Sequence, residues 1–224
     1  EIGISISIKN GDIIDIKNCI DGNRVYLGFS AEMKLKKIFN SFSTYEKINI
    51  GGVSGQKLSK NDIIYFKNIK SPTTKKIPSS FINRYDQTKI IRIIEGIHFD
   101  KIENNLTLID NHFKISSNSD RMGLRLLNNK IKLNNYNEID STVVTKGTIQ
   151  VPRDGNPIIL MSDSQSTGGY PIIGNICRVD ISKITQIKPN KRFKFKIITL
   201  DESNRILEYE FKKFKSKLDI KLST

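Results

Sequence analysis

The chain has 224 residues, of which 37% are hydrophobic, and a formal net charge of +14. It holds no apolar run near the roughly 20 residues that a membrane-spanning helix needs, which excludes membrane proteins built from such helices. Its two cysteines, Cys19 and Cys177, stand far apart and outside any CxxC motif, so the sequence gives no sign of a disulfide framework or a zinc site. We therefore expect a cytoplasmic protein with reduced thiols and no bound metal.

The positive charge admits two explanations. Strongly basic surfaces are typical of proteins that bind nucleic acids or acidic membranes. Here, however, Ile, Lys and Asn are all abundant together, as codon bias toward A and T would produce. The densest basic stretch, Lys188 to Lys217, contains Arg192, Lys194 and Lys196 in alternation with apolar residues, which is typical of a strand with a solvated face. We favour the compositional explanation and expect neither a nucleic-acid nor a membrane partner.

The first segments of the chain alternate apolar and polar residues with a period of two. This pattern predicts strands at Ile2–Ile8, Ile13–Ile16 and Arg24–Phe29. The dipeptide Asn10-Gly11 between the first two is a strong hairpin-turn signal. The N-terminal part is therefore expected to consist of strands and tight turns.

The middle of the chain contains a change of composition. Lys60–Asp62 predicts a turn that leads into a strand at Ile63–Phe66. Lys70–Ser80 is rich in Pro, Ser, Thr and Lys and has no apolar rhythm, so it is the candidate linker. After it, Lys89–Glu95 resumes as a buried strand.

Helices are expected in only two places, at the start of Phe99–Asp110 and at Ile181–Gln186. The sequence therefore predicts a mainly β protein in two parts, residues 1–80 and residues 81–224. Because exposed strand edges must be closed or covered, barrel-like units are favoured over open sheets.

The first segment that could carry chemistry is Ser119–Leu126. As a strand it places Arg121, Gly123 and Arg125 on one face. The other face holds three apolar residues, Met122, Leu124 and Leu126. Two guanidinium groups beside a glycine could hold a carboxylate, phosphate or carbonyl group against the backbone. The alternative is two solvated or salt-bridged arginines, with Gly123 marking a bulge.

The second such segment begins with a tight turn at Val151–Pro157, where Asp154-Gly155 supplies positive φ. Ile158–Met161 is a continuous apolar run and predicts a buried strand. It is followed by three hydrogen-bonding residues with a period of two, Asp163, Gln165 and Thr167. Asp163 could act as a general base or bind a ligand amine or a basic side chain, although a polar strand end is equally common.

A double-glycine loop, Thr167–Pro171, ends that segment. The backbone N–H groups of Gly168 and Gly169 could converge as an anion-binding nest or an oxyanion hole. The alternative is an ordinary tight turn. Tyr170-Pro171 is also a candidate cis peptide bond.

Several common sites are absent from the sequence. There is no GxxxxGK[ST] motif for a P-loop and no Ala-Met-Lys-Met sequence for biotin attachment, so no cofactor is expected to be bound by this chain. His98 and His112 stand alone and are interpreted as surface or packed histidines. Neither cysteine has a nearby histidine that could activate it as a nucleophile.

Taken together, these motifs resemble one family. They are SDRMGLRL at 119–126, GTIQVPRDGNPIILMSDSQSTGGYPIIG at 147–174, and Gln186 followed by Pro189-Asn190, with upstream matches at 24–27, 41–44 and in the glycine-rich loop 51–58. The family is that of biotin-dependent carboxyltransferases, also called allophanate hydrolase subunit 2. Its members include the C-type subunit of bacterial 5-oxoprolinase and the kinase-inhibitor antagonist protein of sporulating bacteria. The resemblance covers most of the chain.

The resemblance implies cyclophilin-like β-barrel units. Relatives carry a further N-terminal segment, so the first unit is expected to be incomplete at its N-terminus. The resemblance also implies that the chain is a subunit of an ATP-dependent 5-oxoprolinase. That enzyme opens the lactam ring of 5-oxoproline to give glutamate, and the subunit is expected to be inactive on its own. Its partners would be a homologous B-type subunit (allophanate hydrolase subunit 1-like) and a third subunit. These partner subunits would use the ATP, or biotin if the reaction is a carboxyl transfer. Two alternatives stay open: a regulatory antagonist of a histidine-kinase inhibitor, and the carboxyltransferase component of a urea carboxylase-like or allophanate hydrolase-like system.

The family's glycine- and arginine-rich positions fall on a defined set of residues. These are Arg121, Gly123, Arg125, Gln150, Pro152, Asp154, Gly155, Asp163, Thr167, Gly168, Gly169 and Tyr170. If the chain acts in a 5-oxoprolinase, Arg121 and Arg125 would hold the substrate carboxylate. The amides of Gly168 and Gly169 would polarise the lactam carbonyl, and Asp163 would orient a nucleophile or a proton. Substrate binding is also assigned to Gly123, Gln150, Asp154, Thr167 and Tyr170.

Overall fold

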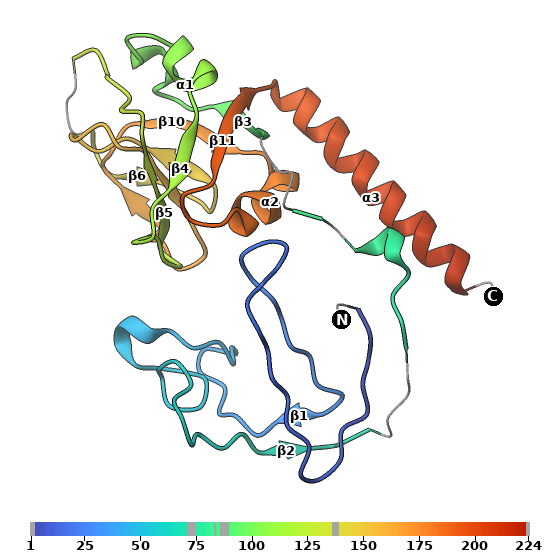
Figure 1. Ribbon diagram of the computed structural model, residues 1–224. Helices are drawn as coiled ribbons and strands as arrows, with labels where there is room; N and C mark the ends of the chain where they lie inside the picture. Colours follow the sequence, from blue (N-terminus) through green and yellow to red (C-terminus); the bar gives the residue numbers. More distant parts are fainter. Residues whose placement is uncertain (1–2, 71–74, 83, 86–89, 136–138, 223–224) are drawn as a thin grey trace. The chain divides into compact units, whose positions relative to one another are not determined.

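The computed structural model describes residues 3–70, 75–82, 84–85, 90–135 and 139–222 (Figure 1). The chain divides into two compact units. The first consists of Glu1–Asn18 and Val25–Asn83, and the second of Cys19–Arg24 and Arg84–Thr224. The sequence suggested a division after residue 80, and nothing in it indicated that the short segment 19–24 joins the second unit.

The first unit has little regular structure. Its strands are β1 (Glu32–Met33) and β2 (Phe66–Lys67), which pair antiparallel, and its helical turns are η1 (Glu46–Ile48) and η2 (Ser79–Phe81). Over the described residues, the strands predicted in three N-terminal segments and at 63–66 are therefore wrong, except at Phe66. Ile2 and residues 71–74 of the predicted linker lie outside the described residues.

The N-terminal strands fail for a physical reason. Alternation produces a strand when its apolar face packs on another surface, and these apolar side chains stay exposed: Ile6 by 73%, Ile13 by 91% and Tyr26 by 87%. Turns depend on local chemistry instead, and the two turns predicted in this unit are confirmed. The Asp12 amide donates to the Lys9 carbonyl across Asn10-Gly11, and the Asp62 amide donates to the Ser59 carbonyl, each at 3.1 Å.

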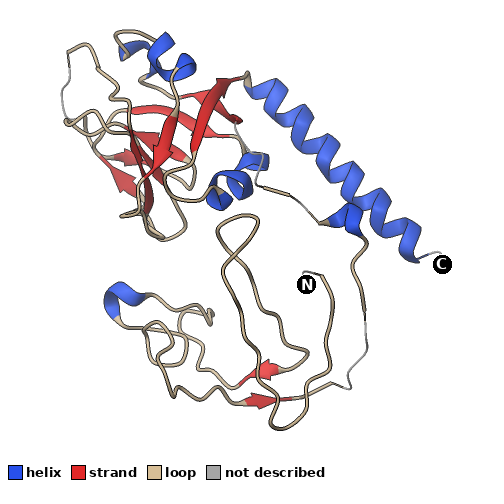
Figure 2. Cartoon of the chain, viewed as in Figure 1, coloured by secondary structure: helices blue, strands red, loops and turns tan. Residues whose placement is uncertain are grey.

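The second unit is a closed seven-stranded β-barrel, which confirms the mainly β, barrel-type prediction (Figure 2). Its strands are β3 (Ile90–Glu95), β4 (Phe113–Ile115), β5 (Gly123–Leu127), β7 (Thr148–Gln150), β8 (Ile158–Leu160), β10 (Ile172–Ile176) and β11 (Arg192–Ile197). Around the barrel they follow the order β10-β3-β11-β4-β5-β8-β7. Only β3 and β11 run parallel among these pairs. A further pair, β6 (Thr142–Val143) and β9 (Thr167–Gly168), lies outside the barrel order.

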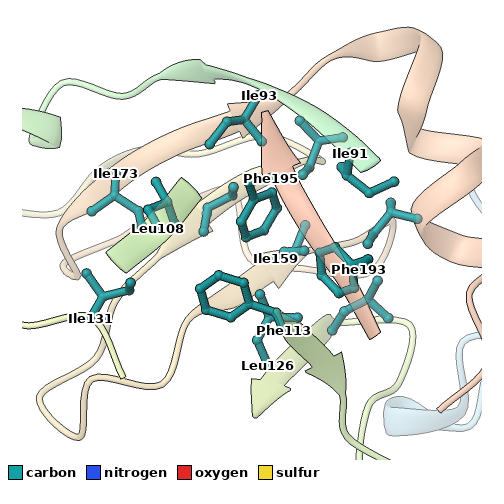
Figure 3. Packing of buried hydrophobic residues seen from close by; sticks show 14 of the residues in the cluster. Ile91, Ile93, Leu108, Phe113, Leu126, Ile131, Ile159, Ile173, Phe193 and Phe195 are labelled. Atoms are coloured by element: carbon teal, nitrogen blue, oxygen red, sulfur yellow. The ribbon is translucent and has the colours of Figure 1, made fainter. Parts of the chain in front are cut away.

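The barrel encloses the hydrophobic core (Figure 3). Phe113, Phe193 and Phe195 form an aromatic cluster, with ring centroids 5.2 Å apart between Phe113 and Phe195 and 5.3 Å apart between Phe193 and Phe195. Ile91 and Ile93 of β3 are fully buried beside them. Strand alternation turns these side chains inward and leaves polar groups outside.

The helices agree in part with the sequence. At the predicted helix start in 99–110 there is only the 3-10 turn η3 (Phe99–Lys101), and the α-helix α1 (Leu106–Asp110) lies at the end of that range. The helix predicted at 181–186 is confirmed as α2 (Ile181–Gln186), which follows η4 (Arg178–Asp180). Helix α3 (Leu200–Leu222), which follows β11, was not predicted. No helix in the described part of the chain is both long and apolar enough to cross a bilayer.

A buried ionic cluster joins η4 and α2 to the barrel. The carboxylate of Asp180 is fully buried and accepts hydrogen bonds from Arg92 Nε at 2.8 Å and Nη2 at 2.6 Å. Lys183 Nζ lies 2.8 Å from the same carboxylate. Burial alone would raise the pKa of Asp180, but the hydrogen bonds from Arg92 and Lys183 outweigh it and hold the pKa below its ordinary value.

Segment 19–24 is held in the second unit by two side chains at the end of α2. The side-chain oxygen of Gln186 accepts from the amides of Asn23 and Arg24, both at 2.8 Å, and its amide nitrogen donates to the Arg24 carbonyl at 3.1 Å. Lys188 Nζ donates to the carbonyls of Cys19 and Ile20 at 2.7 and 3.1 Å. These contacts explain why six residues leave the first unit and fold with the barrel.

Candidate functional site

The candidate site is a pocket of about 390 Å³ on the barrel unit. Four segments meet there: the loop before β5, the strand β5 itself, the turn between β7 and β8, and the loop between β9 and β10, which carries Tyr170. The lining residues of the pocket are Ser116, Asn118, Arg125, Leu126, Leu127, Pro152, Asp154, Asn156, Ile158 and Tyr170. Three residues predicted to bind substrate are among them: Arg125, Asp154 and Tyr170.

Arg125 is placed by the alternation of β5. Leu124 and Leu126 are buried in the core and Arg125 is exposed, as predicted. The strand begins only at Gly123, however, so the prediction of a strand over 119–122, with Arg121 on the face of Arg125, is wrong. The backbone of Arg125 is tied to the preceding loop, because the Arg125 amide donates to Ser119 Oγ at 3.0 Å and the Ser116 amide donates to the Arg125 carbonyl at 2.9 Å. These bonds tie the loop that carries Ser116 to the backbone of Arg125, and both residues line the pocket.

Asp154 is placed by the predicted turn, which is confirmed. The Gly155 amide donates to the Pro152 carbonyl at 2.9 Å, and Gly155 has a φ of 77°, a conformation that favours glycine. Both the side-chain and backbone nitrogens of Asn156 donate to the Asp154 carboxylate, at 2.8 and 3.0 Å. These hydrogen bonds, with smaller contributions from Lys130 and Arg125, hold the pKa of Asp154 below its ordinary value. Asp154 therefore presents a carboxylate, and no ion pair within the described residues joins it to Arg125.

Gln150 is outside the pocket lining but is hydrogen-bonded to Tyr170, which lines the pocket. Its side chain is almost fully buried, and its Nε2 donates to the Tyr170 carbonyl at 3.2 Å. The Val151 amide donates to the Pro171 carbonyl at 3.0 Å. A Cβ added to Gly168 would lie 2.9 Å from Gln150 Nε2. Gln150 thus fixes the segment that carries Tyr170, and Gly168 leaves the space that the glutamine occupies.

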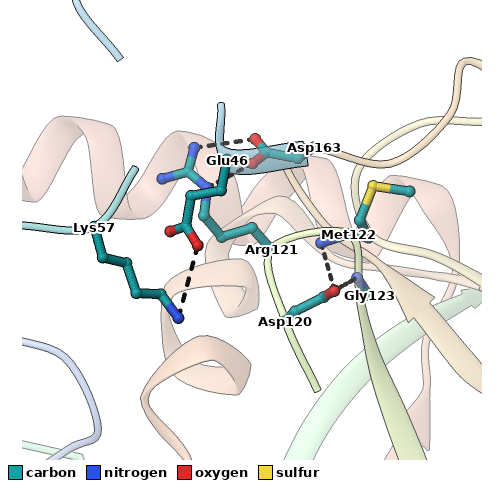
Figure 4. Close-up of polar contacts among 7 residues, drawn as sticks. All are labelled: Glu46, Lys57, Asp120, Arg121, Met122, Gly123 and Asp163. Atoms are coloured by element: carbon teal, nitrogen blue, oxygen red, sulfur yellow. Dashed lines mark hydrogen bonds and ion pairs between the residues drawn. The ribbon is translucent and has the colours of Figure 1, made fainter. Parts of the chain in front are cut away.

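Arg121 and Asp163 form a second group, apart from the pocket lining. Arg121 Nε lies 2.6 Å from Asp163 Oδ2, and its Nη2 lies 3.0 Å from Oδ1 (Figure 4). The strand predicted to carry Asp163 onward to Thr167 is wrong. After β8 the chain turns, with the Ser164 amide donating to the Met161 carbonyl at 3.2 Å. Asp163 therefore pairs with Arg121 and does not share a strand face with Gln165 and Thr167.

The surroundings of Gly123, Gly168 and Gly169 differ from those that the sequence suggested. A Cβ at Gly123 would lie 2.9 Å from Ile158 Cγ2, so a neighbouring side chain fills the space expected for a ligand. Thr167 and Gly168 form β9 against β6, and neither Gly168 nor Gly169 has positive φ. The Tyr170–Pro171 bond is trans, so the expected cis peptide is wrong. The catalytic roles of Gly168 and Gly169 stay predictions.

Three polar residues of the pocket were not predicted: Ser116, Asn118 and Asn156. Their signal was present. Residues 116–120 are a run of Ser, Asn and Asp before a strand, and Asn156 follows the Asp-Gly turn directly. Among the described residues, no three His, Cys, Asp or Glu side chains gather as a metal site, and Cys19 and Cys177 are free thiols.

His98 links the loop after β3 to the strand that follows the pocket segment. Its Nδ1 accepts a hydrogen bond from the Ile172 amide at 3.1 Å, which requires an unprotonated nitrogen. Burial, followed by repulsion from Lys101, lowers the pKa of His98. Because the folded pKa lies below that of the unfolded chain, the stability contributed by neutral His98 is complete above the unfolded pKa of about 6.5 and is lost as the pH falls through the folded value.

We therefore expect the thermal unfolding midpoint to fall between about pH 8 and pH 5 by more in the wild type than in His98→Asn. Asparagine keeps an acceptor near Nδ1 but does not titrate. Thermal melts of both proteins across this range measure the difference. Parallel pH profiles would show that His98 contributes nothing to the acid sensitivity.

The sequence matches the family described as carboxyltransferase domain, subdomain A and B, over residues 1–197. It is 30% identical over 201 residues to the C-type subunit of 5-oxoprolinase from Haemophilus influenzae and 28% identical over 203 residues to that from Escherichia coli. It is 26% identical over 223 residues to the urea amidolyase of Saccharomyces cerevisiae. These matches cover 89%, 90% and 91% of this chain, and 64%, 64% and 12% of the three relatives.

Solved structures show the same fold. The urea amidolyase of Kluyveromyces lactis matches with a TM-score of 0.72 at 19% identity, over 82% of this chain and 12% of that one. The urea carboxylase of the same organism matches with a TM-score of 0.71 at 19% identity, over 82% of this chain and 18% of that one. Helix α3 lies beyond residues 1–197, which the family match covers.

Proposed function

We propose a function from the premise that this chain belongs to the family of carboxyltransferase domains, subdomains A and B. The proposed function is that of a subunit in an assembly that opens the lactam ring of 5-oxoproline at the expense of ATP. A homologous B-type subunit and a third subunit would complete the assembly and use the ATP. Two relatives that are named as the C-type subunit of 5-oxoprolinase support this choice. Because the chain spans 64% of their length, we assign the activity to the assembly and not to this chain alone.

The observation that carries the proposal is the presence of Arg125 and Asp154 in one small pocket. 5-Oxoproline has a carboxylate, a ring N–H and a lactam carbonyl. The guanidinium of Arg125 suits the carboxylate, and the ionised Asp154 suits the N–H donor. The Ser116 hydroxyl and the Asn118 amide supply donors for the carbonyl. A pocket of about 390 Å³ falls within the usual range of small-molecule sites.

Arg121 and Asp163 take a different role in this proposal from the one the sequence suggested. Each is engaged by the other through two contacts, so Arg121 is committed to Asp163 rather than to a substrate carboxylate. Asp163 accepts a bond at each carboxylate oxygen, which suits a residue that positions the loop after β8. We assign substrate recognition to Arg125 and assign a positioning role to the Arg121–Asp163 pair.

The test uses the reconstituted three-subunit assembly and measures ATP-dependent 5-oxoproline hydrolysis. Arg125→Gln is expected to raise KM about tenfold, because it removes a charge-assisted contact worth about 1.4 kcal/mol. Arg205→Gln, which removes an exposed arginine on α3 outside the pocket, is the matched control and should leave KM unchanged. An unchanged KM in Arg125→Gln would show that Arg125 does not bind the substrate carboxylate. Absence of hydrolysis by the wild-type assembly would refute the 5-oxoprolinase proposal itself.

One observation favours a second candidate function, biotin-dependent carboxyl transfer. The yeast relative named urea amidolyase matches 91% of this chain, and the family name itself refers to carboxyl transfer. In that case a biotin carrier would deliver the carboxyl group to the same pocket. Carboxylation of urea by an assembly that contains a biotinylated carrier, without hydrolysis of 5-oxoproline, would establish the second candidate over the first.

A further inference from the structure

A row of basic side chains covers the outside of two neighbouring barrel strands, which lie side by side in Figure 1. We call it the basic strip, and it consists of Lys114 on β4 and Arg192, Lys194 and Lys196 on β11. Phe193 and Phe195 are 0% and 2% exposed and point into the barrel, so the residues that alternate with them face outward. The strip follows from the strand period together with the pairing of β11 with β4.

The strip places like charges directly opposite one another. Arg192 is the cross-strand partner of Lys114 in the antiparallel β4–β11 pair. Side chains in such positions are about 5 Å apart at Cβ, and like charges there destabilise a sheet. Within the described part of the chain, none of the four basic residues takes part in an ion pair. The repulsion between Lys114 and Arg192 is therefore not relieved by a carboxylate from that part of the chain.

Apolar side chains flank the strip on both sides. Leu127 of β5 is the cross-strand partner of Lys114 and is 39% exposed, and Ile90 of β3 is the partner of Lys194 and is 56% exposed. The aromatic rings of β4 and β11 are all buried. A surface for single-stranded nucleic acid combines cations with aromatic rings that stack on bases, and these strands offer no such ring. Cations beside exposed aliphatic groups suit a protein partner instead.

We propose that the basic strip is the docking surface for an acidic segment of a partner polypeptide. Carboxylates placed between Lys114 and Arg192 would relieve the cross-strand repulsion, and aliphatic groups of the partner would cover Leu127 and Ile90. Leu127 also lines the pocket, so the bound segment would lie at the edge of the candidate site. The proposal does not depend on which reaction the assembly catalyses.

The test measures the binding of fluorescent poly-L-glutamate to the whole chain by anisotropy. The double variant Arg192→Glu/Lys194→Glu is expected to bind about tenfold more weakly than the wild type, a loss of about 1.4 kcal/mol. The control Lys212→Glu/Lys215→Glu changes the net charge equally, on α3, and should bind within about twofold of the wild type. Equal losses in the two variants would show that only net charge matters and would overturn the proposal.

A second measurement separates docking from folding. Arg192→Thr removes one member of the like-charge pair, so its thermal unfolding midpoint should rise while its affinity for poly-L-glutamate falls. A variant that binds less because it is damaged would instead unfold at a lower temperature. Oligo-dT of matched charge serves as the competing probe. If it binds more tightly than poly-L-glutamate and loses affinity in the strip variant, the surface serves nucleic acid and the proposal is wrong.

Discussion

Asp180→Asn is expected to lower the free energy of unfolding by about 3 kcal/mol. The substitution keeps the shape of the side chain but leaves Arg92 and Lys183 facing a neutral group in a largely buried site, where the side chain of Arg92 is only 22% exposed. When one partner of such a cluster is removed, the remaining buried charges still pay the cost of desolvation but no longer have an opposite charge beside them, and the loss of stability comes from this imbalance. Chemical denaturation of both proteins at neutral pH measures it.

The control for this prediction is Asp163→Asn, which breaks a similar pair with Arg121. The side chain of Arg121 is 60% exposed, so solvent replaces the lost partner and the cost should stay within about 1 kcal/mol.

The pH dependence of stability offers a second check on the role of Asp180. Because the pKa of Asp180 is lowered in the folded state, its contribution is present above the unfolded value of about 3.9 and is lost as the pH falls through the folded pKa. The stability difference between wild type and variant should therefore shrink in acid.

The effect of Asp180 should extend to segment 19–24. Asp180 anchors η4 to β3, and α2 begins at the next residue and ends with Gln186. Hydrogen exchange of amides 19–24 should therefore be faster in Asp180→Asn than in Asp163→Asn. Unchanged exchange in this segment would mean that Gln186 and Lys188 hold it without support from the buried cluster.

The sequence predicted those elements whose pattern and environment agree. Strands near 90–95, 158–160 and 192–197 have apolar residues that find the barrel interior, and the Asn10-Gly11 and Asp154-Gly155 turns need only local chemistry. The alternating N-terminal segments lack such a surface, and pattern alone cannot supply it. Whether a periodic segment becomes a strand depends on what packs against it.

Helix α3 shows the opposite error, because its signal was present but was interpreted with the wrong period. Thr199 and Glu202 stand three residues apart, and the Glu202 amide donates to Thr199 Oγ1 at 3.1 Å, as in a capping box. The basic stretch 188–217 was interpreted only through the period-two alternation of residues 192–197, so no helix was predicted after it. The end of the strand at Ile197 was indicated by the capping residues Thr199 and Glu202 and not by the pattern of hydrophobic residues.

The candidate site was predicted in its elements but not in its grouping. Arg125, Asp154 and Tyr170 come from three separate motifs and meet in one pocket, whereas Arg121 is paired with Asp163. Strand period placed Arg121 and Arg125 on one face, but Arg121 precedes β5 and follows the loop geometry set by Asp120. Which side chains share a pocket depends on barrel closure, and the order of motifs along the chain does not contain that information.

Phe193→Ala is expected to cost about 3–5 kcal/mol, a large fraction of the free energy of unfolding of a typical domain. Phe193 is fully buried, with its ring centroid 5.3 Å from that of Phe195 and 6.3 Å from that of Phe113, so truncation leaves a cavity in the centre of the barrel. The neighbouring change Lys194→Ala should cost within about 0.5 kcal/mol, because that side chain faces outward. Urea denaturation of the two variants measures the contrast.

Equal losses in the two variants would contradict the inward and outward faces assigned to β11. The contrast also bears on the basic strip. Lys194→Ala should keep the stability of the barrel and still bind poly-L-glutamate more weakly, whereas a weakened but folded Phe193→Leu should keep that affinity. One face of β11 would then hold the barrel together, and the other would be free to bind a partner because the core does not need it.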